Sequence, residues 1–166
     1  MSAIFNARPV RATAFAFAIV LGLAGPAFAD FTTDFPVGLA CPGFTLRVQG
    51  IGADPQPKHS KDNKDGSVTF ITAGRGFQLT FTNLSNSQTL SLRSNGSVNK
   101  TTVNADGTAT VQVTGNSVLI MYPSDLPPGP TSTLYAGRVV FTVDASGNFA
   151  LLGTYGKSTD ICAALA

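Results

Sequence analysis

The chain has no glutamate and no tryptophan, and it contains a single histidine, His59. Any mechanism based on paired carboxylates would therefore depend on aspartate alone, and imidazole catalysis would depend on one side chain. Sugar-stacking surfaces usually use Trp or Tyr rings, and the chain offers only three tyrosines. These absences weigh against the common hydrolase and metalloenzyme chemistries.

Acidic and basic residues balance once the N-terminal segment is set aside. The full chain has eleven Lys and Arg residues against nine aspartates, and Arg8 and Arg11 account for the net charge of +2. The remainder is formally neutral, so it lacks the strong positive field on which nucleic-acid binding depends. We therefore expect no nucleic-acid partner.

The first 29 residues have the pattern of a cleaved export signal. After a basic start, an uncharged apolar run covers residues 12–23, and the small-x-small triplet 27–29 precedes Asp30. A run of about 12 residues is too short for a membrane span, which needs about 20. We predict removal of residues 1–29, a mature N-terminus at Asp30, a secreted extracellular protein and no transmembrane segment.

Residues 30–166 have the length of a single domain, and apolar and polar residues alternate through most of it. Such alternation is typical of strands that bury one face, whereas the continuous apolar run 118–122 is typical of a strand buried on both. The pattern predicts an all-β fold, an antiparallel β-sandwich or barrel of about eight to ten short strands. A helical turn is expected only near residues 160–165. The predicted core comprises Phe44, Leu46, Phe77, Leu79, Phe81, Val111, Val113, Leu119, Val139, Phe141 and Leu151.

Glycine-containing pairs predict the turns between these strands. The pairs at 95–96, 106–107 and 115–116, and the triplet at 146–148, favour the tight turns that join antiparallel neighbours. They predict an antiparallel meander across residues 88–122.

Cys41 and Cys162 are the two cysteines, and they lie near the ends of the predicted domain. An even count in an exported chain favours a disulfide, which would close a loop of about 120 residues. The alternative is a thiol nucleophile or a redox pair. The spacing is not C-x-x-C, and no neighbouring sequence indicates thiol activation.

Two polar stretches interrupt the strand pattern, and we predict that both are loops, where binding residues often lie. Residues 52–65 are rich in lysine, and residues 123–133 contain four prolines. The candidate binding residues on these loops are Lys58, His59, Lys61, Lys64, Pro127 and Pro128. The simpler interpretation is a solvated basic loop, together with a connector that crosses between sheets and uses proline to block edge pairing.

Motifs for catalysis and metal binding are not found. His59, Asp62 and Asp65 lie close together in the sequence, but their spacing matches no established metal site, and the neighbouring lysines would repel a cation. The chain has no G-x-S-x-G, D-T-G or D-S-G motif. We predict no catalytic residue, no metal and no cofactor, and we expect that His59 has neither role.

The ends of the predicted domain resemble those of known exported proteins. Three segments are similar to a group of small secreted actinobacterial proteins of unknown function. They are the opening FTTDFPVGLACPGF (31–44), the segment that runs from residue 122 to residue 140, and the ending STDICAAL (158–165). This resemblance implies export and pairing of the terminal cysteines. It identifies no catalytic residue.

The sequence therefore predicts a secreted, non-enzymatic β-sandwich protein that binds an extracellular partner or a cell-envelope component through its loops. One alternative is a small exported hydrolase using Asp residues, which would need two converging Asp carboxylates or His59 packed against a carboxylate. Another is a structural component of the cell surface, assembled through a strand edge.

Overall fold

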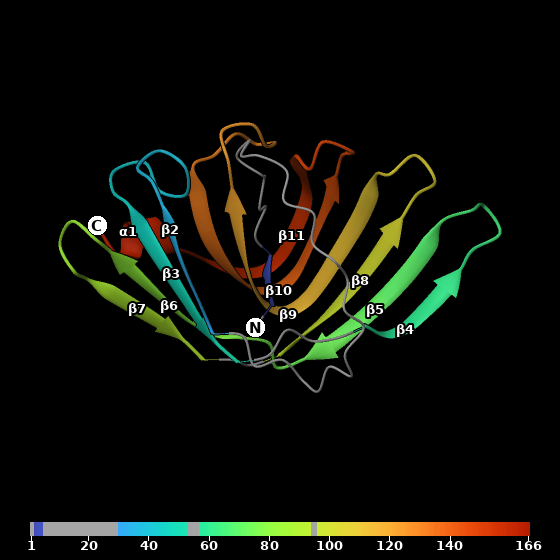
Figure 1. Cartoon of the computed structure of the whole chain (residues 1–166), viewed down its shortest axis with the longest axis horizontal. Coiled ribbons are helices and arrows are strands. Elements are labelled where there is room, and N and C mark those ends of the chain that lie inside the picture. The colour runs from blue at the N-terminus through green and yellow to red at the C-terminus, as the bar shows by residue number, and fades with distance from the viewer. Residues whose placement is uncertain (1, 5–29, 53–56, 94–95) are drawn as a thin grey trace, which may run out of the picture.

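A computed structural model (Figure 1) describes residues 2–4, 30–52, 57–93 and 96–166. Most of the predicted export signal, and Asn95 of the predicted turn at 95–96, lie outside the described residues. Strands dominate the described part of the chain, and its helix is the single turn α1 (Ile161–Ala164), where we expected a helical turn.

Two antiparallel sheets pack together, which confirms the all-β sandwich prediction. The small sheet has the strand order β2 (Phe31–Phe35), β3 (Leu46–Ile51), β6 (Gln78–Asn83), β7 (Thr89–Leu92). The large sheet has the order β11 (Phe149–Asp160), β10 (Thr131–Val143), β9 (Ala109–Met121), β8 (Ser97–Val103), β5 (Val68–Gly74), β4 (Pro57–Asp62). A short strand, β1 (Ser2–Ile4), runs parallel to residues 117–119 of β9. Figure 1 shows the small sheet on the left and the large sheet on the right.

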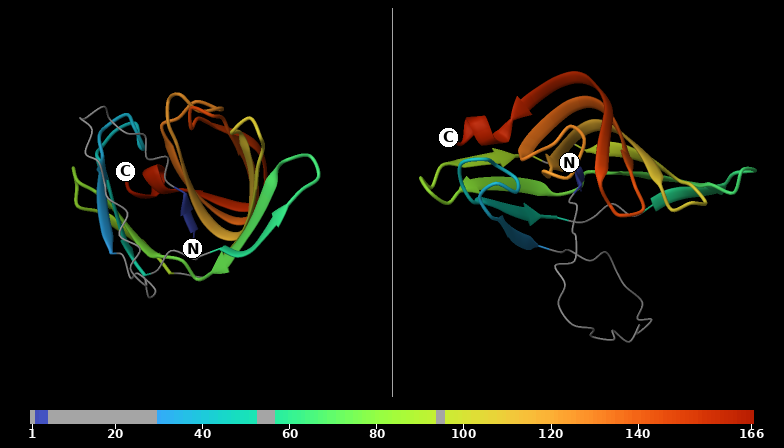
Figure 2. Two further views of the ribbon diagram at one scale, coloured as in Figure 1. Left: turned by 45° about the vertical axis from the view of Figure 1, so that its right-hand side comes forward. Right: turned by 90° about the horizontal axis from the view of Figure 1, so that it is seen from above.

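The long strands of the large sheet are curved (Figure 2), and we infer that they bend at a row of glycines. Gly115, Gly137 and Gly156 are directly opposite one another in β9, β10 and β11, and all three have positive φ. A Cβ atom at Gly137 would collide with the carbonyl oxygen of Tyr155, so a larger residue does not fit. The predicted turn at 115–116 is therefore wrong, because glycine serves a bend inside β9 rather than a chain reversal.

The bend lets the large sheet curl, as the left view of Figure 2 shows, and two cores result. The run 118–122 is buried on both faces, as predicted: Val118, Ile120 and Tyr122 face the small sheet, while Leu119 and Met121 face the curl. All predicted core residues are buried except Phe77 and Leu151, which are half-buried against these cores.

The predicted meander across residues 88–122 is correct only in its second half. β8 and β9 form an antiparallel hairpin, but β7 pairs with β6 in the small sheet while β8 pairs with β5 in the large sheet. The chain therefore passes from one sheet to the other between these strands. Alternation identifies a strand, but it does not identify the strand's neighbour.

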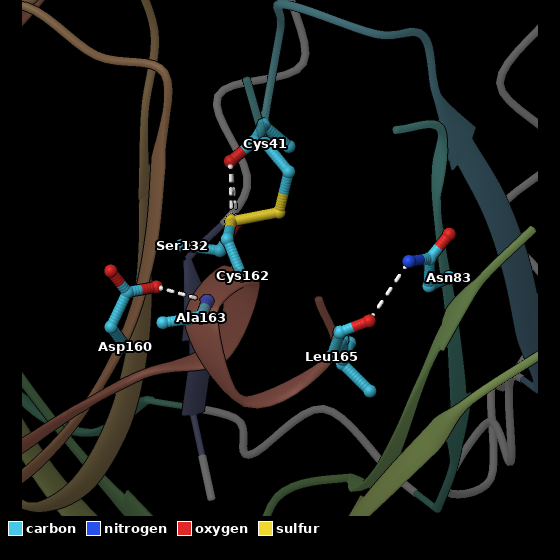
Figure 3. The surroundings of a disulfide bond; sticks show 8 residues. Cys41, Asn83, Ser132, Asp160, Cys162, Ala163 and Leu165 are labelled. Carbon is cyan, nitrogen blue, oxygen red and sulfur yellow. Dashed lines mark hydrogen bonds between the residues drawn. A yellow bond between two sulfur atoms is a disulfide. The ribbon is translucent and has the colours of Figure 1, made fainter. Parts of the chain in front are cut away.

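The predicted disulfide between Cys41 and Cys162 is present, with the two Cα atoms 5.6 Å apart. It joins the segment before β3 to α1 (Figure 3). Two buried hydrogen bonds lie nearby: Ser132 Oγ donates to the Ala40 carbonyl at 3.0 Å, and Asn83 Nδ2 donates to the Leu165 carbonyl at 2.8 Å. The C-terminal turn is thus held covalently on one side and by hydrogen bonding on the other.

Candidate functional site

Residues 57–62 of the lysine-rich stretch form the strand β4, so the loop prediction for residues 52–65 is wrong there, while residues 53–56 lie outside the described residues. β4 pairs antiparallel with β5 at the edge of the large sheet, and a turn at 63–66 follows it. Lysine, aspartate and proline are rare in central strands, but on an edge they prevent pairing with other chains. The side chain of Lys58 lies outside the described residues.

His59 and Lys61 belong to one face of the large sheet. His59 is directly opposite Ile71, and Lys61 is directly opposite Thr69. Residues that are directly opposite in antiparallel strands share a face. We name this the outer face, because it is opposite to the side chains in the curl; beyond the glycine row the same face packs against the small sheet at Val118 and Ile120. Both residues are exposed, as is Lys64 in the turn.

The outer face continues across β8 and β9. Thr102 lies opposite both Thr69 and Thr110, and the hydroxyl oxygens of Thr69 and Thr102 are 3.1 Å apart. Two residues farther along β8, Lys100 lies opposite Ile71 and Gln112. Lys100 is therefore on the same face as Lys61.

The same face extends over β10 and β11. Arg138 lies opposite Thr114 and Tyr155, and its guanidinium carbon is 4.1 Å from the centroid of the Tyr155 ring. Lys157 lies opposite Ala136, two residues farther along β11 than Tyr155. Arg138, Tyr155 and Lys157 are all exposed.

These four exposed cations form a diagonal line, which we call the basic stripe: Lys61, Lys100, Arg138 and Lys157. Each of the first two steps crosses two strands and moves two residues along the register. With strands about 4.8 Å apart and a rise of about 3.4 Å per residue, each such step spans about 12 Å. The last step crosses one strand and spans about 8 Å. Lys61 and His59 were sequence candidates, whereas the other three cations were not.

Three of the aspartates are committed to turns at one end of the large sheet. The carboxylates of Asp65, Asp106 and Asp144 accept hydrogen bonds from the backbone N–H groups of Ser67, Thr108 and Ser146 at 3.0, 2.9 and 2.8 Å. The hydroxyls of Ser67 and Thr108 also donate, and these bonds hold the pKa of Asp65 and of Asp106 below the ordinary value. Such turns account for the Asp–Gly sequences.

Other aspartates are also engaged elsewhere or point away from the outer face, and Asp30 directly precedes β2 of the small sheet. Asp34 forms a two-point ion pair with Arg47 on the small sheet, at 2.7 and 2.8 Å, and this contact lowers the pKa of Asp34. Asp160 caps α1, and Asp62 lies opposite Val68 on the inner face of β4. Within the described residues, none of the four stripe cations forms an ion pair with a carboxylate.

Pro127 and Pro128 are exposed on the connector between β9 and β10. We expected this connector to cross between the sheets, and that prediction is wrong, because β9 and β10 are neighbours in the large sheet. Leu126 instead pairs with the edge of β11, where its N–H donates to the Phe149 carbonyl at 2.8 Å and its carbonyl accepts from Leu151 at 2.6 Å. The prolines are therefore not on the strands of the basic stripe.

Asp125, which the sequence reasoning missed, holds this connector in place. Its side chain is 1 % exposed, and its carboxylate accepts from the N–H groups of Tyr122 at 2.5 Å and Phe149 at 2.9 Å. It thereby joins the residue after β9 to the start of β11. Nothing in the sequence indicated this role, because the prolines around Asp125 resemble those of a solvated linker.

We expect Asp125→Ala to lower the free energy of unfolding by about 2–5 kcal/mol, because two buried N–H groups would lose their acceptor at about 1–3 kcal/mol each. Asp125→Asn keeps one carbonyl oxygen and should cost less. Urea denaturation of both variants against wild type measures the difference. Losses below about 0.5 kcal/mol in both variants would show that the carboxylate is not structural.

Two hollows in the described part of the chain do not supply a second site. A hollow of about 260 Å³ lies beside Phe31 and Gln49, and another of about 450 Å³ lies beside Phe44 and Cys162. Each has one aspartate in its lining, so neither brings two carboxylates together. The described residues contain no group of three His, Cys, Asp or Glu side chains able to share a metal ion.

No family model, curated protein or solved structure matches the chain. In the described part of the chain, no helix has the length and apolar character of a membrane span. The function must therefore be argued from the basic stripe and its surroundings.

Proposed function

We propose that the chain is a secreted, non-enzymatic β-sandwich protein that binds an extracellular partner or a component of the cell envelope. The observation that carries this proposal is the separation of charge. Four exposed cations share the outer face, while seven of the eight described aspartates lie in turns, a helix cap, a buried contact, an ion pair or the opposite face, and the eighth, Asp30, directly precedes β2 of the small sheet. A formally neutral domain can thereby present a locally positive surface.

The roles of the aspartates argue against an Asp-based hydrolase. Paired-carboxylate catalysis requires two carboxyl groups that flank one substrate. Asp65 and Asp106 accept hydrogen bonds inside separate turns, and both oxygens of Asp125 accept from the backbone. The disulfide is compatible with an oxidising compartment.

A surface assembly built through strand edges has less support. The outer edge of β4 carries lysine and proline, which disfavour edge-to-edge pairing. The outer edge of β11 is paired with Leu126 near Ala150. A binding module that uses a sheet face fits these features better.

Fractionation of producing cells tests this proposal. We expect the protein to be retained on the envelope, with an intact mass that corresponds to residues 30–166 and one disulfide. Washing at about 1 M salt should release it, because the Debye length falls to about 3 Å and exposed charges are screened. An exported product that keeps residues 1–29, or a protein that does not associate with the envelope at low salt, would contradict the proposal.

A further inference from the structure

We propose that the basic stripe binds a linear polyanion that lies diagonally across the outer face of the large sheet, from β4 to β11. The inference rests on the proposed binding function and names its ligand class. The polymer carries phosphate, sulfate or carboxylate groups at regular intervals along one chain. Figure 1 shows the strands it would cross, side by side from β4 on the right to β11 near the centre.

The regular placement of the cations favours a line of charge over a single anion. Each step from Lys61 to Lys100 and from Lys100 to Arg138 crosses two strands, and every step moves along the register in the same direction. Lys157 continues the line beyond Arg138. The backbones of these residues are held by sheet hydrogen bonds, so binding orders little besides the side chains.

The side chains between the cations suit an anionic chain. Gln112 and Thr114 of β9 lie between Lys100 and Arg138, and Thr69 and Ile71 of β5 lie between Lys61 and Lys100. Amide and hydroxyl groups can donate to anionic oxygens without adding repulsion. Three of these four intervening side chains are therefore neutral hydrogen-bond donors, and Ile71 is apolar.

Arg138 is the best oriented of the four cations. The ring of Tyr155 packs against its guanidinium group, which limits the rotamers of a long side chain. A guanidinium group can then donate two parallel hydrogen bonds to a phosphate, sulfate or carboxylate. We infer that Arg138 makes the strongest single contact, with Lys100 next to it along the stripe.

A membrane surface fits this face less well than a polymer. Lipid-binding surfaces combine cations with a contiguous apolar area that enters the bilayer. On the outer face the exposed large apolar side chains Val98 and Tyr155 are three strands apart, about 14 Å, and do not form one patch. A nucleic-acid strand would also call for several stacking rings, and the stripe has one aromatic neighbour, Tyr155.

The test uses the protein secreted with its own leader, released from the envelope by the high-salt wash and returned to low salt. Linear inorganic polyphosphate, heparin and polygalacturonate serve as phosphate, sulfate and carboxylate probes, and phosphatidylglycerol vesicles serve as the membrane probe. Isothermal titration at low salt gives Kd, and a salt series gives its ionic dependence. Comparison of the three polymers identifies the preferred anionic group.

The variant is Lys100→Gln with Arg138→Gln, and the matched control is Arg47→Gln with Arg93→Gln, which removes the same charge from the small-sheet side of the molecule. We expect wild type to bind at least one polymer with affinity that falls as salt rises. The stripe variant should raise Kd about 30-fold or more, and the control variant should raise it by less than about threefold. Thermal denaturation should show both variants folded.

Equal weakening by stripe and control variants would overturn the proposal, because it would indicate a response to net charge alone. Binding to vesicles without polymer binding would also overturn it. Retention on the envelope by a protein that binds none of the three polymers would refute the ligand class and leave the proposed binding function standing. A protein that neither binds the polymers nor associates with the envelope would refute both.

Discussion

Replacing Phe81 with alanine is expected to lower the free energy of unfolding by about 3–5 kcal/mol. The Phe81 side chain is 0 % exposed and belongs to the core between the two sheets. It lies in β6, directly opposite Val48 of β3 and Leu90 of β7. Truncation would remove buried apolar surface and leave a cavity that three paired strands cannot close.

Thr80→Ala is the matched control, because Thr80 precedes Phe81 in β6 and points to the opposite face. Its hydroxyl is 3.2 Å from that of Ser91, an exposed contact, so the change should cost less than about 0.5 kcal/mol. Urea denaturation with an unchanged m-value measures both effects. Equal losses would mean that the two faces of β6 are reversed, since a shift of one residue exchanges them.

Removing the disulfide with Cys41→Ala and Cys162→Ala is expected to cost up to about 4–5 kcal/mol, because the bridge closes a loop with a sequence separation of 121. Both cysteines are buried in the core that also contains Ile161 and Leu165. The C-terminal turn would therefore lose its covalent attachment at the place where it covers the small sheet.

The fold should nevertheless persist without the bridge. Asn83 still binds the Leu165 carbonyl, and a domain of this size has a core large enough to stand alone. Thermal denaturation of the double variant should therefore remain cooperative at a lower midpoint, and denatured wild type should show no titratable thiol. An unchanged midpoint, or a variant without a cooperative transition, would contradict this account.

The candidate site was only partly visible in the sequence. Lys61 and His59 were selected because they lie in a basic segment, yet the segment proved to be an edge strand and not a loop. Lys100, Arg138 and Lys157 are isolated in the sequence and gave no local signal. Strand order and register alone bring them into one line with Lys61.

Glycine and proline misled the sequence interpretation for a related reason. Gly115 resembles a turn residue, but it lies inside β9, directly opposite Gly137 of the neighbouring strand β10. The prolines around Asp125 resemble a linker, but its buried carboxylate joins two strand ends. Glycine and proline each occur in several kinds of local structure, and contacts between distant segments decide which kind forms.

The amino-acid sequence was sufficient to predict an all-β fold, most of the side chains of its core, and a disulfide between its two cysteines. Alternation indicates which face of a strand is buried, whichever strand lies beside it. The cysteine count indicates that a disulfide can form, whatever the order of the strands. The tertiary structure alone decided the sheet to which each strand belongs, the bend at the glycine row and the alignment of the basic stripe. Those features depend on pairing between strands far apart in the chain, and alternation leaves that pairing open because many registers bury the same faces.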